Sequence, residues 1–209
     1  MNKKRTIYHL IVDRSGSMLD CVDATINGFN EQLHRIRNLE TEFPEQELRV
    51  GLTLFDDHID FVRTMSSVAD MPQLDRHNYI PGGCTALLDG IGQTITRLQD
   101  WQRQNPDTDA TFVVVILTDG YENSSQFFNL EQVRSLIREL EATGKWTFSF
   151  IGATLDAAEV AQQMAIKEQN SYSFNKESMK GEVWDKLSGS MHGYFNKKRS
   201  GNDLSNFFD

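Results

Sequence analysis

One apolar run ends directly in a carboxylate and a glycine: Thr111-Phe-Val-Val-Val-Ile-Leu-Thr-Asp-Gly120. From Phe112 to Leu117 every side chain is apolar, so the run does not alternate between apolar and polar residues. Such a segment is typical of a parallel strand that helices cover on both faces. It therefore predicts a central strand of a layered α/β fold, with Asp119 just beyond the carboxyl end of the strand.

Similar runs recur along the chain and alternate with helical patterns. The expected strands span 6–13, 48–56, 58–65, 111–119, 146–153 and 171–175. Apolar residues at steps of three and four predict amphipathic helices over 22–36, 87–101, 130–140 and 183–191. The reversal Phe55-Asp-Asp-His-Ile59 is too short for a helical crossover, so the strand after it should return antiparallel. The predicted fold is α/β: a doubly wound, Rossmann-like sheet in the order 3-2-1-4-5-6, mostly parallel, with one antiparallel edge strand and helices on both faces.

Length and charge bound the organisation and exclude some functions. A chain of 209 residues can bury one full core. After Phe195 the periodic pattern stops, so we expect one domain over 1–195 and a flexible tail over 196–209. The alternative is that Leu204, Phe207 and Phe208 form a short docking motif for the domain itself or for another protein. A net charge of -9 argues against nucleic acid as a partner, because binding to phosphates requires clustered Lys and Arg.

The expected location is cytoplasmic. No apolar run reaches the roughly 18 to 20 residues that span a bilayer, so a membrane is not expected as a partner either. Cys21 and Cys84 have neither the spacing of a metal site nor that of a disulfide framework, and we expect both to be reduced.

Two carboxylates are expected to meet where the winding of the sheet reverses. Asp13 ends the first strand, and Asp119 ends the fourth, which is its neighbour in the predicted order. Ser15 and Ser17 follow Asp13 closely, and the glycine pair before Thr85 leads into a helix, where the threonine hydroxyl could reach the same crevice. Close like charges require a cation, and Mg²⁺ prefers oxygen ligands.

These residues resemble the metal-ion-dependent adhesion site (MIDAS) of von Willebrand factor A (VWA) domains. The matching pattern is Asp13-Xaa-Ser15-Xaa-Ser17, then Thr85 after a glycine pair, then Thr118-Asp119-Gly120. The likeness extends over about 6–195, and further stretches such as Thr118-Asp-Gly-Tyr-Glu-Asn-Ser-Ser125 look like a group of short, stand-alone bacterial VWA proteins.

The resemblance implies a ligand set and a partner. Ser15, Ser17 and Thr85 would ligate Mg²⁺ or Mn²⁺, with Ca²⁺ as an alternative, and Asp13 and Asp119 would act directly or through water. One coordination position stays open, and an Asp or Glu of a partner protein would fill it. We therefore expect a metal-dependent protein-interaction module and not an enzyme.

Two other functions stay open: a metal-dependent hydrolase of phosphoesters or esters, and a structural subunit that a metal only stabilises. A haloacid-dehalogenase-type phosphatase would require a second aspartate two residues after Asp13, where Ser15 stands. A serine hydrolase would require a histidine base near Ser15 or Ser17, and the sequence places none there.

Three charged residues stand beside the motifs, and Glu122 and Asp89 are further oxygen candidates near the crevice. Arg14 stands where VWA domains more often have a small residue, and it would either attract an acidic ligand or lie in solvent. Glu122 is expected to face solvent in a loop. Asp89 is expected only to complement the dipole at a helix start.

Overall fold

The computed structural model describes residues 4–106, 108–153, 157–176, 179 and 181–208. The strands are β1 (Lys4–Asp13), β2 (Gln46–Phe55), β3 (Ile59–Ser66), β4 (Ala110–Thr118), β5 (Trp146–Gly152) and β6 (Ser171–Ser173). The helices are α1 (Val22–Glu42), α2 (Leu87–Gln104), α3 (Leu130–Glu141), α4 (Ala157–Gln163) and α5 (Glu182–Ser200), with short 3-10 segments η1 (Gly16–Cys21) and η2 (Glu168–Asn170).

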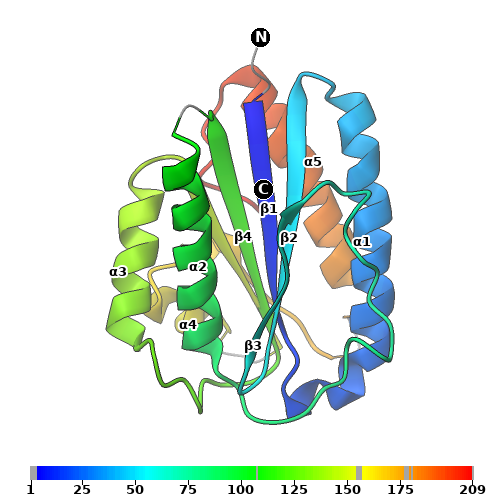
Figure 1. Cartoon of the computed structure of the whole chain (residues 1–209), viewed down its shortest axis with the longest axis vertical. Helices are drawn as coiled ribbons and strands as arrows, with labels where there is room; N and C mark the ends of the chain where they lie inside the picture. The colour runs from blue at the N-terminus through cyan, green and yellow to red at the C-terminus, as the bar shows by residue number, and fades with distance from the viewer. Residues whose placement is uncertain (1–3, 107, 154–156, 177–178, 180, 209) are drawn as a thin grey trace.

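The six strands form one sheet in the order β3-β2-β1-β4-β5-β6 (Figure 1). Strand β3 runs antiparallel to β2, and the other neighbouring strands are parallel. Both the strand order and the antiparallel edge strand are as predicted from the sequence. In this order the carboxyl ends of β1 and β4 lie side by side, at the lower edge of the sheet in Figure 1.

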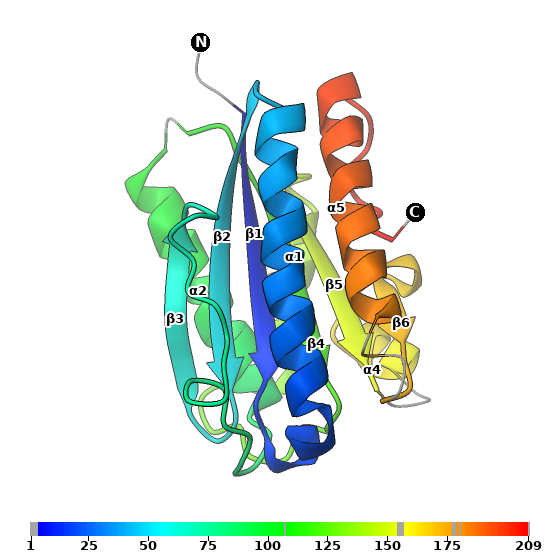
Figure 2. The ribbon, with the colours of Figure 1, turned by 90° about the vertical axis from the view of Figure 1, so that its right-hand side faces the viewer.

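Helices cover both faces of the sheet, as predicted. Helices α1 and α5 pack beside each other on one face, and α2, α3 and α4 cover the other (Figure 2). Side chains of β1 alternate between the two cores: Tyr8 and Leu10 face α1 and α5, whereas Ile7 and Ile11 face α2 and α3. All four are fully buried. A strand that is buried on both faces has no exposed polar side, which explains why residues 7–12 of β1 are mostly apolar; the buried polar His9 pairs with Thr53 Oγ1 at 2.8 Å.

One described helix was not predicted. Helix α4 is seven residues long, and its buried residues are the small Ala157 and Ala161, so it has no stripe of large apolar side chains. None of the helices in the described part of the chain combines the length and the apolar composition that a membrane crossing requires.

The chain after Phe195 differs from the predicted flexible tail. Helix α5 continues to Ser200 and ends where Gly201 takes a left-handed conformation with φ of 69°. The segment then folds back: Phe207 is only 2% exposed, its backbone N–H donates to Asn170 Oδ1 at 2.7 Å, and the Leu204 carbonyl accepts from Thr147 Oγ1 at 2.9 Å. No periodic pattern in the sequence marks this packing, because a few apolar side chains without regular spacing can hold an irregular, mostly polar segment against the domain.

Candidate metal centre

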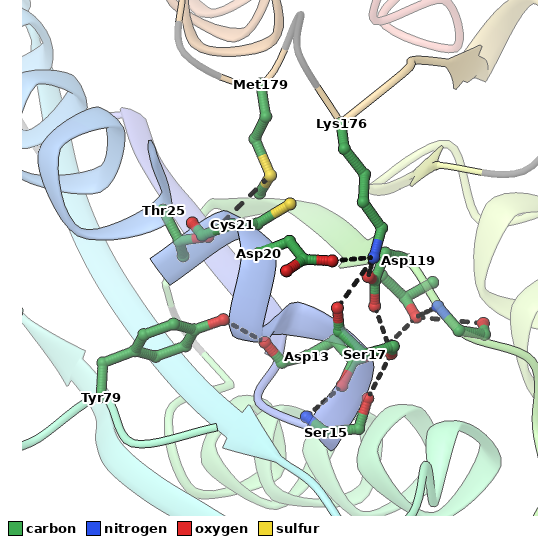
Figure 3. A network of polar contacts seen from close by, with 12 residues as sticks. Asp13, Ser15, Ser17, Asp20, Cys21, Thr25, Tyr79, Asp119, Lys176 and Met179 are labelled. Atoms are coloured by element: carbon green, nitrogen blue, oxygen red, sulfur yellow. Dashed lines mark hydrogen bonds and ion pairs between the residues drawn. The ribbon is translucent and has the colours of Figure 1, made fainter. Parts of the chain in front are cut away.

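Asp13 ends β1 inside the protein, and hydrogen bonds hold both of its carboxylate oxygens. Oδ1 accepts from the backbone N–H of Ser15 at 2.6 Å, and Oδ2 accepts from the Thr118 hydroxyl at 2.5 Å. The Tyr79 hydroxyl donates to the Asp13 carbonyl at 2.7 Å. The carboxylate therefore has a fixed orientation at the end of the strand (Figure 3).

The loop after β1 brings both predicted serines to the same place. Their hydroxyl oxygens lie 3.0 Å apart, and the Ser17 hydroxyl donates to Asp119 Oδ1 at 2.5 Å. The backbone N–H of Gly16 donates to the Gly83 carbonyl at 3.2 Å and so ties this loop to the glycine pair. Residues more than a hundred positions apart in the chain thus meet in one crevice.

Thr85 is held in the crevice by a third loop. Its backbone N–H donates to the Asn123 side chain at 2.8 Å, and its carbonyl accepts from the Asn123 N–H at 3.0 Å. Thr85 is 3% exposed. These contacts fix the position of Thr85, two residues before α2 begins at Leu87.

The space beside Gly120 fits a small cation. A Cβ atom built on Gly120 would lie 3.0 Å from Thr85 Oγ1, 3.3 Å from Ser17 Oγ and 3.6 Å from Asp13 Oδ2. Oxygens of three predicted ligands therefore surround one small volume. Within the described part of the chain, the polar partner of the buried Asp119 Oδ2 is a partly exposed cationic side chain, Lys176, and no hydrogen bond from another group reaches this oxygen. Mg²⁺ or Mn²⁺ suits such a set of carboxylate and hydroxyl oxygens, so the residues present are compatible with the implied ion.

Burial makes the negative charge of this crevice unfavourable in the absence of a cation. It raises the pKa of Asp13 to about 6, against the hydrogen bonds from Thr118 and Ser15, which lower it; the charge of Asp119 adds to the rise. A carboxylate in this setting gains from a nearby positive charge.

Lys176 supplies such a charge, and the sequence analysis missed it. Its Nζ lies 2.7 Å from Asp119 Oδ2 and donates to the Ser17 carbonyl at 2.8 Å (Figure 3). Burial lowers the pKa of Lys176, but contact with the Asp119 carboxylate raises it more, so the pKa lies above its usual value. No motif marked this lysine, which comes from the segment between β6 and α5.

Comparison with known families agrees with this arrangement. A family model for the von Willebrand factor type A domain matches residues 9–186, which is most of the chain. The chain belongs to the von Willebrand factor type A family. The resemblance predicted from the metal-site motifs is thereby confirmed at the level of the family.

Solved structures of other VWA-containing proteins have the same fold. The PilB minor pilin from Streptococcus sanguinis is 11% identical with a TM-score of 0.64, and the match covers 91% of this chain and 62% of the pilin. The vWF domain of the type V pili tip protein Mfa5 from Porphyromonas gingivalis is 8% identical with a TM-score of 0.62, and the match covers 92% of this chain and 96% of that one. Manganese-loaded TRAP from Plasmodium vivax is 13% identical with a TM-score of 0.57, over 88% of this chain and 73% of that one.

These likenesses are limited to the fold. The chain spans less than two thirds of the PilB chain, and all three identities are low. No curated protein matches the chain.

Two acidic residues that were expected to stand apart from this VWA site instead build its loops. Asp89 is 4% exposed and accepts backbone hydrogen bonds from Gln126, Phe127 and Phe128 at 2.7 to 2.9 Å. It therefore does more than complement a helix dipole.

Glu122 does not face solvent, so that prediction was wrong. Its carboxylate accepts from the backbone N–H groups of Leu88, Ser124 and Ser125 at 2.7 to 2.9 Å. The carboxylate turns inward because N–H groups in the loop and in the first turn of the helix have no backbone acceptor and donate to it instead. With Asp89, it joins the start of α2 to the loop that carries Asp119.

Arg14 follows neither of its two expected roles. Its Nε donates to Asp56 Oδ2 at 3.0 Å, and the two side chains are 17% and 12% exposed. The Arg14 carbonyl also accepts from the Gly82 N–H at 2.9 Å. Arg14 therefore ties the serine loop to the β2–β3 turn and to the glycine pair, and Asp56 balances its charge.

Proposed function

We propose that this VWA domain is a metal-dependent protein-interaction module. Asp13, Ser15, Ser17, Thr85 and Asp119 would hold a divalent cation, Mg²⁺ or Mn²⁺, and an acidic side chain of a partner protein would complete its coordination. The observation that carries the proposal is the small volume beside Gly120, which oxygens of Thr85, Ser17 and Asp13 surround.

The kinds of ligand favour binding of an external carboxylate. Three of the five groups are neutral hydroxyls, which donate less charge to a cation than carboxylates do. The cation therefore keeps an affinity for one more negative oxygen. Hydrogen bonds from Ser15 and Thr118 fix the orientation of the Asp13 carboxylate before any cation binds. The family supports the general kind of function, because VWA domains are commonly metal-dependent adhesion or interaction modules.

The contacts of the two serines support binding over hydrolysis. The Ser15 and Ser17 hydroxyls contact each other, and Ser17 donates to Asp119, whereas a nucleophilic serine would donate to a histidine base. Buried His9 lies elsewhere, with its Nε2 against Thr53 Oγ1 at 2.8 Å. We also retain the cytoplasmic location as a proposal from the sequence.

The test is recovery of partners from the source cells with immobilised full-length protein. We expect one set of proteins to be retained in Mg²⁺ and released by EDTA. The doubly changed Asp13→Asn, Asp119→Asn protein, checked for folding by circular dichroism, should not retain them. A partner's recognition Asp changed to Asn should cost on the order of 2 to 5 kcal/mol in binding, because a desolvated charge contact is lost.

Two outcomes would contradict the proposal. If the folded double variant binds no Mn²⁺ and still recovers the same partners, the metal only stabilises the fold. If the wild-type protein hydrolyses a phosphoester or ester with Mn²⁺ and the double variant does not, the site is catalytic.

A further inference from the structure

We propose that Lys176 is an internal cation of the metal centre, which balances Asp119 in the metal-free protein and competes with the divalent ion for that carboxylate. This inference rests on the proposed metal site and goes beyond it, because it assigns a residue that sets the metal affinity of this particular chain.

The contacts of the Lys176 ammonium group resemble those of a bound ion. Nζ lies 2.7 Å from Asp119 Oδ2, 2.8 Å from the Ser17 carbonyl oxygen and 3.8 Å from Asp20 Oδ2. Figure 3 shows the side chain extending across the crevice to Asp119, directly beside Ser17. One positive charge thus already contacts two of the residues predicted to ligate the metal.

Both oxygens of Asp119 have a partner while Lys176 is in place. Oδ1 accepts from the Ser17 hydroxyl, Oδ2 faces Nζ, and the aspartate side chain is 0% exposed. Each carboxylate oxygen has a second lone pair, but a cation bound at Oδ2 would lie close to the charge of Nζ, so the two cations compete for this oxygen. The Ser17 hydroxyl can ligate a cation through its oxygen and still donate its proton to Asp119, so the competition is with Lys176.

The charges indicate the same competition. Asp13, Asp119 and Lys176 together carry a formal charge of -1. A divalent ion would raise this to +1 if the lysine remained, and like charges in a partly buried crevice disfavour each other. Departure of the ammonium group, or arrival of a partner's carboxylate, would relieve that repulsion.

The Lys176 side chain can move from Asp119 to the surface. Its side chain is 39% exposed, so its movement does not require the core to open. Asp20, whose side chain is 83% exposed, already lies within 4.0 Å and can keep the ammonium group as a surface ion pair after it leaves Asp119. Such exposed pairs cost little to form or break.

The experiment measures Mn²⁺ binding by isothermal titration calorimetry on the EDTA-treated, dialysed full chain. The variants are Lys176→Met, which removes the charge, and Lys176→Arg, which keeps it. Lys145→Met is the matched control, because Lys145 is exposed and precedes β5 at the opposite end of the sheet from the crevice. Thermal unfolding of each metal-free protein provides a second measurement.

We expect Lys176→Met to bind Mn²⁺ roughly tenfold more tightly than the wild type, because a charge-assisted contact of the competitor is lost. Lys176→Arg and Lys145→Met should bind about as the wild type does. In the absence of metal, Lys176→Met should melt at a lower temperature than the wild type, because the buried Asp119 loses its counter-charge. This combination of lower stability and tighter metal binding is specific to a competing cation.

Equal or weaker Mn²⁺ binding by Lys176→Met would overturn the inference, and weaker binding together with a lower melting temperature would assign Lys176 a structural role. If neither the wild type nor Lys176→Met binds Mn²⁺, the proposed function falls and this inference falls with it. If Lys176→Met alone binds Mn²⁺, the lysine competes as proposed, whereas the proposed function of the wild type is refuted.

Discussion

Substitution of Gly120 by alanine tests the position of the cation directly. A methyl group there would lie 3.0 Å from Thr85 Oγ1 and 3.3 Å from Ser17 Oγ, in the volume that the predicted ligands surround. Gly120 is not among the glycines with positive φ, so alanine at this position adds no backbone strain. The change therefore fills the site and leaves each ligand side chain present.

The expected loss of affinity follows from these distances. Mg²⁺ requires its oxygens at about 2.1 Å in near-octahedral array. A methyl carbon 3.0 to 3.6 Å from three of them would crowd these oxygens and the coordination sphere of an ion bound between them. Loss of one or two charge-assisted contacts would cost about 2 to 4 kcal/mol, or roughly 30- to 700-fold in affinity. The stability of the metal-free protein should change by less than about 1 kcal/mol, because the contacts at 3.0 and 3.3 Å are to side-chain hydroxyls that can shift slightly.

Calorimetric titration with Mn²⁺ and urea unfolding without metal measure the two quantities. Gly189→Ala is the matched control, because a Cβ atom there meets nothing within 4 Å. The reasoning is refuted if folded Gly120→Ala binds Mn²⁺ as tightly as the wild type, since the ion would then lie elsewhere. Thr85→Val, which removes one hydroxyl and keeps the shape of the side chain, should also weaken binding.

Three further predictions concern the rest of the molecule. Phe207→Ala should lower the free energy of unfolding, measured by urea titration, by about 3 kcal/mol or more, because this side chain is 2% exposed. A change below about 0.5 kcal/mol would mean that the segment after α5 does not pack against the domain in solution. Burial lowers the pKa of Lys198 in the folded protein to about 7. Above that pH the unfolded chain therefore binds more protons than the folded protein does, so the free energy of unfolding should rise by roughly 2 to 4 kcal/mol between about pH 7 and 10. Lys198→Met should remove most of that rise, and an unchanged pH profile would contradict the assignment. Asp89→Asn should destabilise the protein by about 2 kcal/mol and speed hydrogen exchange at the backbone amides of 126–128, because these amides lose a charged acceptor. Unchanged exchange at these amides would refute the role of Asp89 in holding the loop.

The fold could be predicted because its signals are local. Continuous apolar runs mark strands that are buried on both faces, and the short turn between Phe55 and Ile59 forces β3 to run antiparallel. Four of the five predicted metal-site residues lie in short motifs at or just after the ends of β1 and β4, and strand order brings these motifs together. Thr85 precedes α2 and is held beside them by loop contacts with Asn123, while metal binding by the five stays a prediction.

The supporting contacts could not be predicted, because they join residues far apart in the sequence without any pattern. Lys176 reaches Asp119, Glu122 reaches the N–H of Leu88, and Arg14 reaches Asp56. A single charged residue in a loop carries no periodicity, and its partner depends on loop conformation. The tail was misjudged for the same reason: Phe207 is one anchor in an irregular polar segment.

The contacts also explain which acidic side chains on this edge of the sheet remain available to a cation. The β2–β3 turn gathers Asp56, Asp57 and His58 closely enough to hold an ion. However, Arg14 binds Asp56 Oδ2, and the His58 N–H donates to Asp56 Oδ1 at 2.7 Å, so both oxygens of that carboxylate are already bound.

Asp89 and Glu122 are saturated in the same way, by backbone N–H groups. Backbone N–H groups and an arginine thus hold Asp56, Asp89 and Glu122 in the loops, whereas Asp119 is paired with a lysine that is 39% exposed and can move away. Asp119 is therefore the buried carboxylate on this edge whose charge is balanced by a group that can leave. This difference, more than the number of acidic residues, would direct a divalent cation to the proposed site beside Gly120.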